Sequence, residues 1–134
     1  MAILTVGQAA QVVGRMLNLS GADLQKVKQI YAQIDIDALK AQAQDRIKIV
    51  DWKPGDRAPT GVLYEDVYPH LKEGGKAYYL YLEGQLLYFQ YSHPRTGKRL
   101  YTDQDLQDAK KAHISMLVER LVNEAIIENI VEQL

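Results

Sequence analysis

The sequence predicts an α+β fold, in which helices from both ends of the chain pack on a small, mainly antiparallel sheet. Apolar residues recur at spacings of three and four in the first 46 residues, which is typical of amphipathic helices. Residues 76–92 contain two strand-like runs separated by Glu83-Gly84, and residues 103–134 contain neither glycine nor proline. A chain of 134 residues fits a single domain, with a helical part (1–46), a sheet part (47–102) and a long C-terminal helix (103–134).

Two or three helices are expected before residue 47. Thr5 followed by Gln8 fits a capping box, in which side chains satisfy the free amides of the first helical turn. The segment NLSG (18–21) interrupts the apolar spacing, and Ser20 can cap a second helix. Asp35 and Asp37 are possible caps for a third helix that extends to residue 46, although the second and third helices could equally be continuous.

The middle of the chain predicts strands joined by turns. IKIVDW (47–52) has the β-branched content of a strand, and the two prolines and two glycines of 53–61 indicate a loop. Residues 61–75 are ambiguous, because their apolar spacing fits a helix while Pro69 opposes a long one. HPRTGK (93–98) predicts a turn, after which residues 98–102 can pair as a third strand beside the hairpin.

The hairpin of residues 76–92 has two possible registers. A two-residue turn at Glu83-Gly84 separates an aliphatic face from a tyrosine face, but glutamate fits the required left-handed conformation poorly. A three-residue loop with Gly84 in the left-handed position has better backbone chemistry and is the register that we expect. In either register both faces carry large side chains, so each face needs a covering layer.

The C-terminal segment predicts a long helix that begins with a capping box of Thr102 and Asp105. A continuous helix would be ~46 Å long at 1.5 Å per residue, whereas a globule of this size is roughly 36 Å across. The helix should therefore extend beyond its domain or break near Asn123. Its end carries an apolar stripe that either folds back as core or binds a partner. The stripe consists of Ile126, Ile127, Ile130, Val131 and Leu134.

The amino-acid composition excludes several classes of protein. The chain has no cysteine, which excludes a disulfide scaffold, a thiolate nucleophile and cysteine-ligated zinc. The first residues lack the features of a secretory signal peptide, and no apolar run approaches the ~20 residues needed to span a bilayer. An intracellular, cytoplasmic location is expected, including a place in a particle assembled inside the cell. The net charge of −1 is too low for a dedicated nucleic-acid-binding protein.

Catalytic chemistry is not indicated. The three histidines, His70, His93 and His113, lie too far apart in sequence to form a metal pair on one helix. No phosphate-binding loop, dinucleotide fingerprint or serine nucleophile motif is present. The paired carboxylates lie where helix caps and loops use them. We therefore expect no catalytic residue, no metal, no cofactor and no small-molecule substrate.

The tyrosine-rich hairpin with its basic loop is the other candidate site. Six of the nine tyrosines lie within residues 76–102, beside a short basic segment. Tyrosine and arginine suit protein interfaces and can also stack on bases and contact phosphates. The simplest alternative is a sheet whose tyrosines pack beneath helices. The candidate residues are Tyr79, Tyr81, Tyr88, Arg95, Lys98 and Arg99.

These features favour a non-enzymatic structural or assembly protein that forms homo-oligomers or docks into a larger protein complex. The helix–hairpin–helix layout resembles that of small adaptor proteins in phage head–tail connectors. In that class a short chain forms a ring, and a terminal helix or tail contacts the neighbouring ring. The alternative is a small nucleic-acid-binding module that uses the hairpin and the basic loop.

Overall fold

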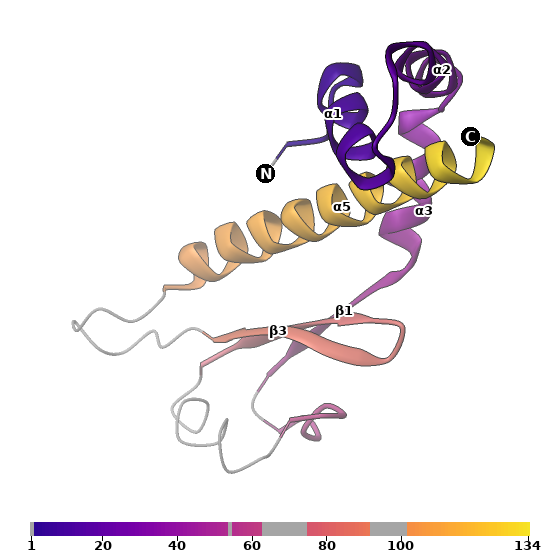
Figure 1. Ribbon diagram of the computed structural model, residues 1–134. Helices are drawn as coiled ribbons and strands as arrows, with labels where there is room; N and C mark the ends of the chain where they lie inside the picture. Colours follow the sequence, from indigo (N-terminus) through magenta and orange to yellow (C-terminus); the bar gives the residue numbers. More distant parts are fainter. Residues whose placement is uncertain (1, 54, 63–74, 92–101) are drawn as a thin grey trace. The chain divides into compact units, whose positions relative to one another are not determined.

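Helices occupy both ends of the chain and three strands lie between them (Figure 1). The computed structural model describes residues 2–53, 55–62, 75–91 and 102–134. The α+β class and the long C-terminal helix are therefore confirmed. The elements are α1 (Val6–Leu17), α2 (Gly21–Ala32), α3 (Ile36–Asp45), β1 (Ile47–Trp52), β2 (Ala77–Leu82), β3 (Gln85–Tyr91) and α5 (Asp103–Gln133).

The chain divides into two compact units. Unit 1 contains Met1–Gln44 and Met116–Leu134, and is built from α1, α2, α3 and the C-terminal part of α5. Unit 2 contains Asp45–Ser115, and is built from the three strands and the N-terminal part of α5. Helix α5 thus contributes residues to two separate cores.

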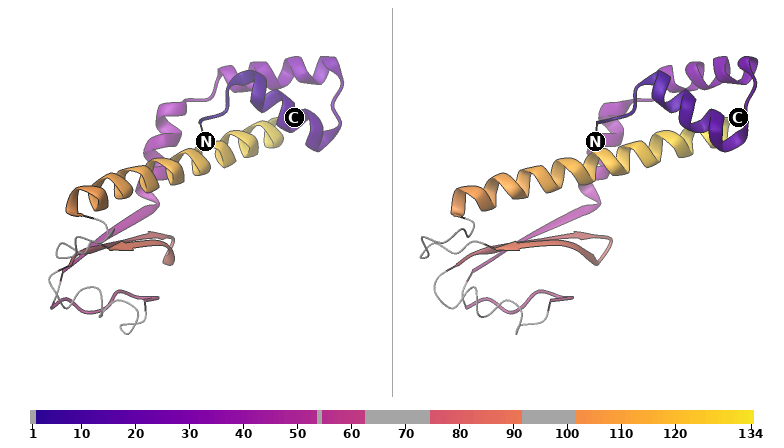
Figure 2. Two further views of the ribbon diagram at one scale, coloured as in Figure 1. Left: turned by 90° about the vertical axis from the view of Figure 1, so that its left-hand side faces the viewer. Right: turned by 60° about the vertical axis from the view of Figure 1, so that its left-hand side comes forward.

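Helix α1 begins with the predicted capping box. The amide of Gln8 donates to the Thr5 hydroxyl at 3.2 Å, and the amide of Thr5 donates to the Gln8 side chain at 3.0 Å. The helix ends at Leu17 and is followed by the C-cap residue Asn18, which adopts the left-handed conformation with φ 53°. Both views of Figure 2 show α1 lying beside the C-terminal part of α5.

Helices α2 and α3 are separate. Ser20 occupies the N-cap position of α2, but its hydroxyl donates to the Asp23 carboxylate at 3.1 Å instead of accepting a backbone amide. The carboxylate of Asp35 accepts the amide of Ala38 at 3.1 Å, which identifies Asp35 as the residue that starts α3. The alternative of one continuous helix is therefore wrong, because Asp35 satisfies a first-turn amide of a new helix.

The core of unit 1 is formed by small and branched apolar side chains. Small residues on α1 allow close helix packing, and Gly14 lies so near α2 that an added Cβ would be 3.1 Å from the Leu24 side chain. The fully or nearly fully buried residues are Ala9, Ala10, Val13, Val27, Ala43, Leu117, Leu121, Val122, Ile126 and Ile130.

Asn123 is the buried polar residue of this core, with 8% of its surface exposed. Its side-chain oxygen accepts the amide of Leu4 at 2.8 Å, and its side-chain nitrogen donates to the carbonyl of Ala2 at 3.1 Å. The side-chain amide therefore pairs with the N-terminal segment as a neighbouring peptide group would. The Tyr31 hydroxyl donates to the Leu4 carbonyl at 2.7 Å and holds the same segment from α2.

Unit 2 contains an antiparallel sheet in the order β1-β2-β3. The predicted strand at 47–52 is confirmed with both of its bounds, and it pairs with the first strand of the hairpin. The central strand β2 is buried at every position except Leu82. The predicted strand at 98–102 lies outside the described residues apart from Thr102, which directly precedes α5. Most of the ambiguous segment 61–75 also lies outside them.

The hairpin turn differs from the register that we expected. Leu82 pairs directly with Gln85, so the turn has two residues, and both Glu83 and Gly84 adopt positive φ angles of 51° and 86°. The favoured three-residue glycine loop is wrong. An irregularity follows one pair later, where Tyr81 opposes Leu86 and Leu80 opposes Tyr88. Leu87 is the extra residue of a β-bulge, which moves the following side chains of β3 to the other face.

The two faces of the sheet pack against different partners. On the face that we call the helix face, Tyr78 and Leu80 form a buried cluster with Leu106 of α5. On the opposite face, which we call the loop face, Trp52, Ala77, Tyr79 and Tyr81 form a second buried cluster. Partly buried residues complete the loop face, namely Val50, Val62, Leu86, Phe89 and Tyr91.

Helix α5 begins with the predicted capping box and continues for 31 residues. The amide of Asp105 donates to the Thr102 hydroxyl at 3.2 Å, and the amide of Thr102 donates to the Asp105 carboxylate at 3.1 Å. No break occurs at Asn123, because its side chain bonds to the N-terminal segment and leaves the helical backbone intact. Within the described part of the chain, no helix is long and apolar enough to cross a membrane.

Candidate functional site

The tyrosines proposed as a recognition surface are part of the sheet layers of unit 2. Tyr79 has no exposed surface, and Tyr81 has 6% of its surface exposed. Tyr79 stacks on Phe89 with ring centroids 5.3 Å apart, and the Tyr81 hydroxyl donates to the Thr60 carbonyl at 2.7 Å. Neither ring presents a face on which a base could stack.

The hydroxyl groups of Tyr79 and Tyr81, on the loop face, have pKa values above that of an ordinary tyrosine. The Tyr79 hydroxyl is buried without a hydrogen-bond partner among the residues that the structure describes. Burial, and then the neighbouring Tyr81, raise the pKa of Tyr79 to about 12. Burial also raises the pKa of Tyr81. Both groups remain neutral at physiological pH because a phenolate in this apolar layer would be poorly solvated.

Tyr88 lies on the helix face and contacts α5. Its ring stacks on His113 with centroids 4.8 Å apart, and the Tyr78 hydroxyl shares a hydrogen bond with Nδ1 of the same histidine. His113 thus has two tyrosine neighbours in the contact between α5 and the sheet. The remaining predicted residues of this site, Arg95, Lys98 and Arg99, lie outside the described residues.

The C-terminal stripe is divided between core and surface. Ile126 and Ile130 have no exposed surface, and Ile127 is half-buried. Val131 and Leu134 are 36% and 41% exposed. Ile126 and Ile130, which are four residues apart on one side of the helix, therefore supply core of unit 1. Leu134 continues the same side and Val131 lies next to it, and both are exposed to solvent.

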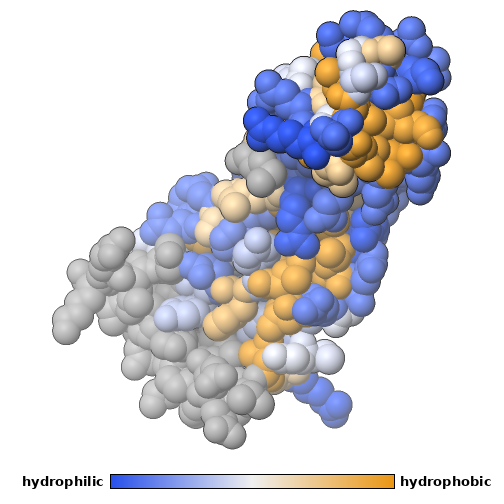
Figure 3. All heavy atoms as spheres, in the orientation of Figure 1, coloured by the Kyte–Doolittle hydropathy of each residue, from blue (hydrophilic) through white to orange (hydrophobic). Residues whose placement is uncertain are grey.

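The last turn of α1 also exposes apolar side chains, and both views of Figure 2 show this end of α1 near the C-terminal end of α5. Met16 and Leu17, in the last turn of α1, are 59% and 43% exposed. Figure 3 shows apolar atoms gathered on the surface over α1 and the C-terminal end of α5. We call the four side chains Met16, Leu17, Val131 and Leu134 the apolar end of unit 1.

Neither Met16 nor Leu17 was among the candidate residues predicted from the sequence. Val12 and Met16 widen the apolar side of α1 beyond its buried residues Ala9, Ala10 and Val13, and Val12 is 37% exposed. This wide apolar side could have indicated an exposed apolar surface in the sequence. When the apolar side of a helix is wider than a neighbouring helix can cover, some of its side chains remain in water.

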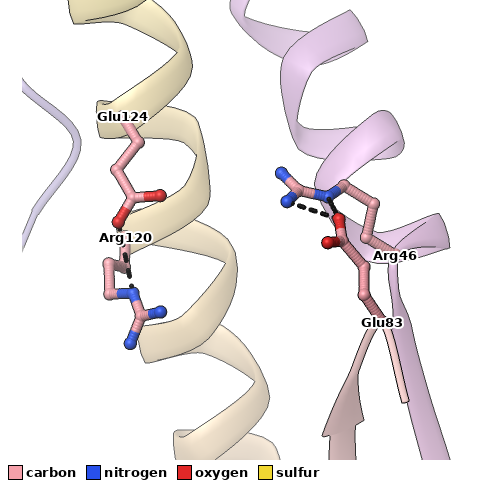
Figure 4. A network of polar contacts seen from close by, with 4 residues as sticks. All are labelled: Arg46, Glu83, Arg120 and Glu124. Carbon is pink, nitrogen blue, oxygen red and sulfur yellow. Dashed lines mark hydrogen bonds and ion pairs between the residues drawn. The ribbon is translucent and has the colours of Figure 1, made fainter. Parts of the chain in front are cut away.

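Charged groups on both units form exposed ion pairs. In unit 2, the Arg46 guanidinium contacts the Glu83 carboxylate at 2.7 Å (Figure 4). In unit 1, Arg120 contacts Glu124 one turn later on α5 at 3.4 Å (Figure 4). These pairs are solvent-exposed, so each contributes roughly 0–1 kcal/mol.

Three of the described carboxylates at helix starts have structural roles. Asp35 and Asp105 accept helix-cap amides, and Asp103 accepts a bond from Lys76 at 3.3 Å. Among the residues that the structure describes, no group of three or more histidine, aspartate or glutamate side chains could hold a metal ion. Glu65 and Asp66, another carboxylate pair of the sequence, lie outside these residues.

Comparison with other proteins leaves the family open. No protein-family model matches the chain. The searches of curated proteins and of solved structures likewise return no match. The functional argument therefore rests on the chain's own surface.

Proposed function

We propose that the protein is a non-catalytic assembly protein that associates with a second copy of itself through the apolar end of unit 1. The observation that supports this proposal is the exposure of four apolar side chains in a unit that already has its own core, namely Met16, Leu17, Val131 and Leu134. Burying such side chains contributes about 25 cal/mol per Å² of apolar surface removed from water.

Charge around this surface favours a second copy over an unrelated partner. Arg15 lies beside Met16 at the end of α1, and Glu132 lies beside Val131 at the end of α5. Both side chains are exposed, and neither forms an ion pair with another described residue. In a two-fold symmetric contact the α1 end of each copy can meet the α5 end of the other, which pairs Arg15 with Glu132 twice.

The alternative of a nucleic-acid-binding module has less support. It needs aromatic rings with a free face, whereas Tyr79 and Tyr81 are buried. Assembly through a two-fold contact needs only a self-complementary surface, whereas a ring of the kind that connector adaptor subunits form needs a second, head-to-tail contact.

Light scattering over a concentration series tests the proposal. The expected mass is about 30 kDa for a two-copy assembly, from a chain of 15.2 kDa. The double variant Met16→Asp and Leu134→Asp should give the monomer mass while its circular dichroism stays unchanged. Met116→Asp is the matched control, because Met116 is 52% exposed on the same helix but lies far from its C-terminal end.

A charge exchange tests the partner identity. Arg15→Glu should weaken association by like-charge repulsion with Glu132, and adding Glu132→Arg to the same chain should restore it. A mass of one chain at every concentration would overturn the proposal. Equal loss of mass with Met116→Asp, or no rescue by the exchange, would contradict this surface as the contact.

A further inference from the structure

A cavity of about 420 Å³ lies on the loop-face side of unit 2. Residues of β1, the loop 55–60 and the β2–β3 hairpin line it. Its volume falls in the range of pockets that accept small organic molecules. The residues that matter for its chemistry are Lys48, Val50, Trp52, Arg57, Thr60 and Tyr81.

The wall formed by the loop is fixed to the sheet by two aromatic side chains. The Trp52 indole nitrogen donates to the Arg57 carbonyl at 2.8 Å, and the Tyr81 hydroxyl donates to the Thr60 carbonyl at 2.7 Å. The loop is also closed by its own turn, in which the Lys53 amide donates to the Asp56 carboxylate at 3.0 Å. The pocket is therefore preformed, and a ligand would not need to order the loop.

These hydrogen bonds also determine which atoms remain for a ligand. The polar atoms of Trp52 and Tyr81 are already satisfied by backbone carbonyls. Trp52 and Tyr81 are 5% and 6% exposed, so they meet the pocket with only a small part of their rings, and the half-buried Val50 side chain completes an apolar lining. Such a lining suits a flat hydrocarbon or aromatic body.

The charges at the pocket favour an anion. Lys48 and Arg57 line it, and neither forms an ion pair with another described residue. Of the two lining carboxylates, Asp51 is neutralised by Lys110 at 2.9 Å and Asp56 accepts the Lys53 amide. The two cations therefore outnumber the one unneutralised carboxylate, and Arg57 can hold a planar anion through two donors.

We propose that this pocket binds a small organic anion with a planar, apolar body. Val50, Trp52 and Tyr81 contact the body, and Lys48 and Arg57 contact the carboxylate, sulfonate or phosphate group. This site is independent of the assembly surface, because all its lining residues belong to unit 2 and the apolar end belongs to unit 1.

Trp52 is the single tryptophan of the chain, which gives the pocket its own reporter. The experiment follows the indole N–H signal of Trp52 by ¹H–¹⁵N NMR during titration with 2-naphthoate. Matched titrations use the uncharged 2-naphthamide and inorganic phosphate. We expect a saturable shift with 2-naphthoate, about tenfold weaker binding of 2-naphthamide, and weak or no binding of phosphate.

Variants distinguish this pocket from other apolar surfaces. Arg57→Gln should weaken 2-naphthoate binding about tenfold, and the same substitution at Lys53, which does not line the pocket, should leave it unchanged. The remaining amide signals confirm that each variant is folded. No saturable shift of Trp52, equal affinity for naphthoate and naphthamide, or equal effects of Arg57→Gln and Lys53→Gln would each overturn the proposal.

Discussion

At the scale of single residues, two tyrosines on the same face differ in one hydrogen bond. The Tyr79 hydroxyl is buried and has no hydrogen-bond partner in the described part of the chain, whereas the Tyr81 hydroxyl donates to the Thr60 carbonyl. A buried polar group without a partner costs about 1–3 kcal/mol, and a satisfied one contributes about 1 kcal/mol. The loop face thus contains a stabilising phenol and a destabilising phenol two residues apart.

Tyr79→Phe should raise the free energy of unfolding by about 1 kcal/mol, because it removes the unpaired hydroxyl and keeps the ring. Tyr81→Phe should lower it by a similar amount because the Thr60 carbonyl loses its donor. Urea unfolding followed by circular dichroism measures both values. A loss of stability in Tyr79→Phe equal to that in Tyr81→Phe would show that the Tyr79 hydroxyl has a partner.

Asn123 offers a second residue-scale test. Asn123→Ala should lower the free energy of unfolding by about 1–3 kcal/mol, since the two hydrogen bonds to the Leu4 amide and the Ala2 carbonyl are lost and each contributes about 0.5–1.5 kcal/mol. Asn129→Ala is the control on the same helix, because that side chain bonds to the Ala125 carbonyl of its own helix one turn earlier. If thermal unfolding shows equal effects of the two substitutions, the pairing with the N-terminal segment contributes nothing.

At the scale of elements, the parts that local chemistry decides could be predicted from the sequence. The capping boxes at Thr5 and Thr102 and the strand at 47–52 depend on residues close together in the chain, and the structure has each of them. The helix boundary at Asp35 remained open, because Asp35 and Asp37 have the same capping chemistry.

The hairpin register could not be predicted, because it depends on a bulge that no local signal marks. Turn chemistry disfavoured glutamate at a positive φ angle, yet Glu83 adopts it. The Leu87 bulge then places Phe89 beside Tyr79 and turns Tyr88 towards His113. The candidate tyrosines could therefore be identified from the sequence, but the face of the sheet on which each one lies could not be predicted.

The strained turn leads to a prediction for Glu83. Glu83→Asn should stabilise the hairpin, since asparagine followed by glycine suits this turn and the left-handed conformation costs other residues about 1 kcal/mol. Loss of the exposed Arg46 pair offsets roughly 0–1 kcal/mol of that gain. In an Arg46→Gln background the pair is already absent, so Glu83→Asn should stabilise more there, as measured by urea unfolding. Destabilisation in both backgrounds would contradict the turn conformation.

At the scale of the whole molecule, one uninterrupted helix serves two cores. Residues 103–115 of α5 belong to unit 2 and residues 116–133 belong to unit 1. No glycine, proline or change in composition marks this boundary in the sequence, because helix continuity and core membership are separate properties. The pocket of unit 2 was equally invisible, since it brings together β1, a loop and the hairpin turn.

Because the two units have separate cores, a substitution that removes core side-chain atoms from one unit should lower the protection of amides from hydrogen exchange mainly in that unit. Leu106 is buried against the sheet and Ile126 is buried in unit 1. Leu106→Ala should lower the opening free energy of β2 amides by about 2–5 kcal/mol and leave α1 amides nearly unchanged. Ile126→Ala should do the reverse, and native-state hydrogen exchange measures both. Equal loss of protection in α1 and β2 for both variants would show that the chain unfolds as one cooperative unit, in which case α5 transmits the loss from one core to the other.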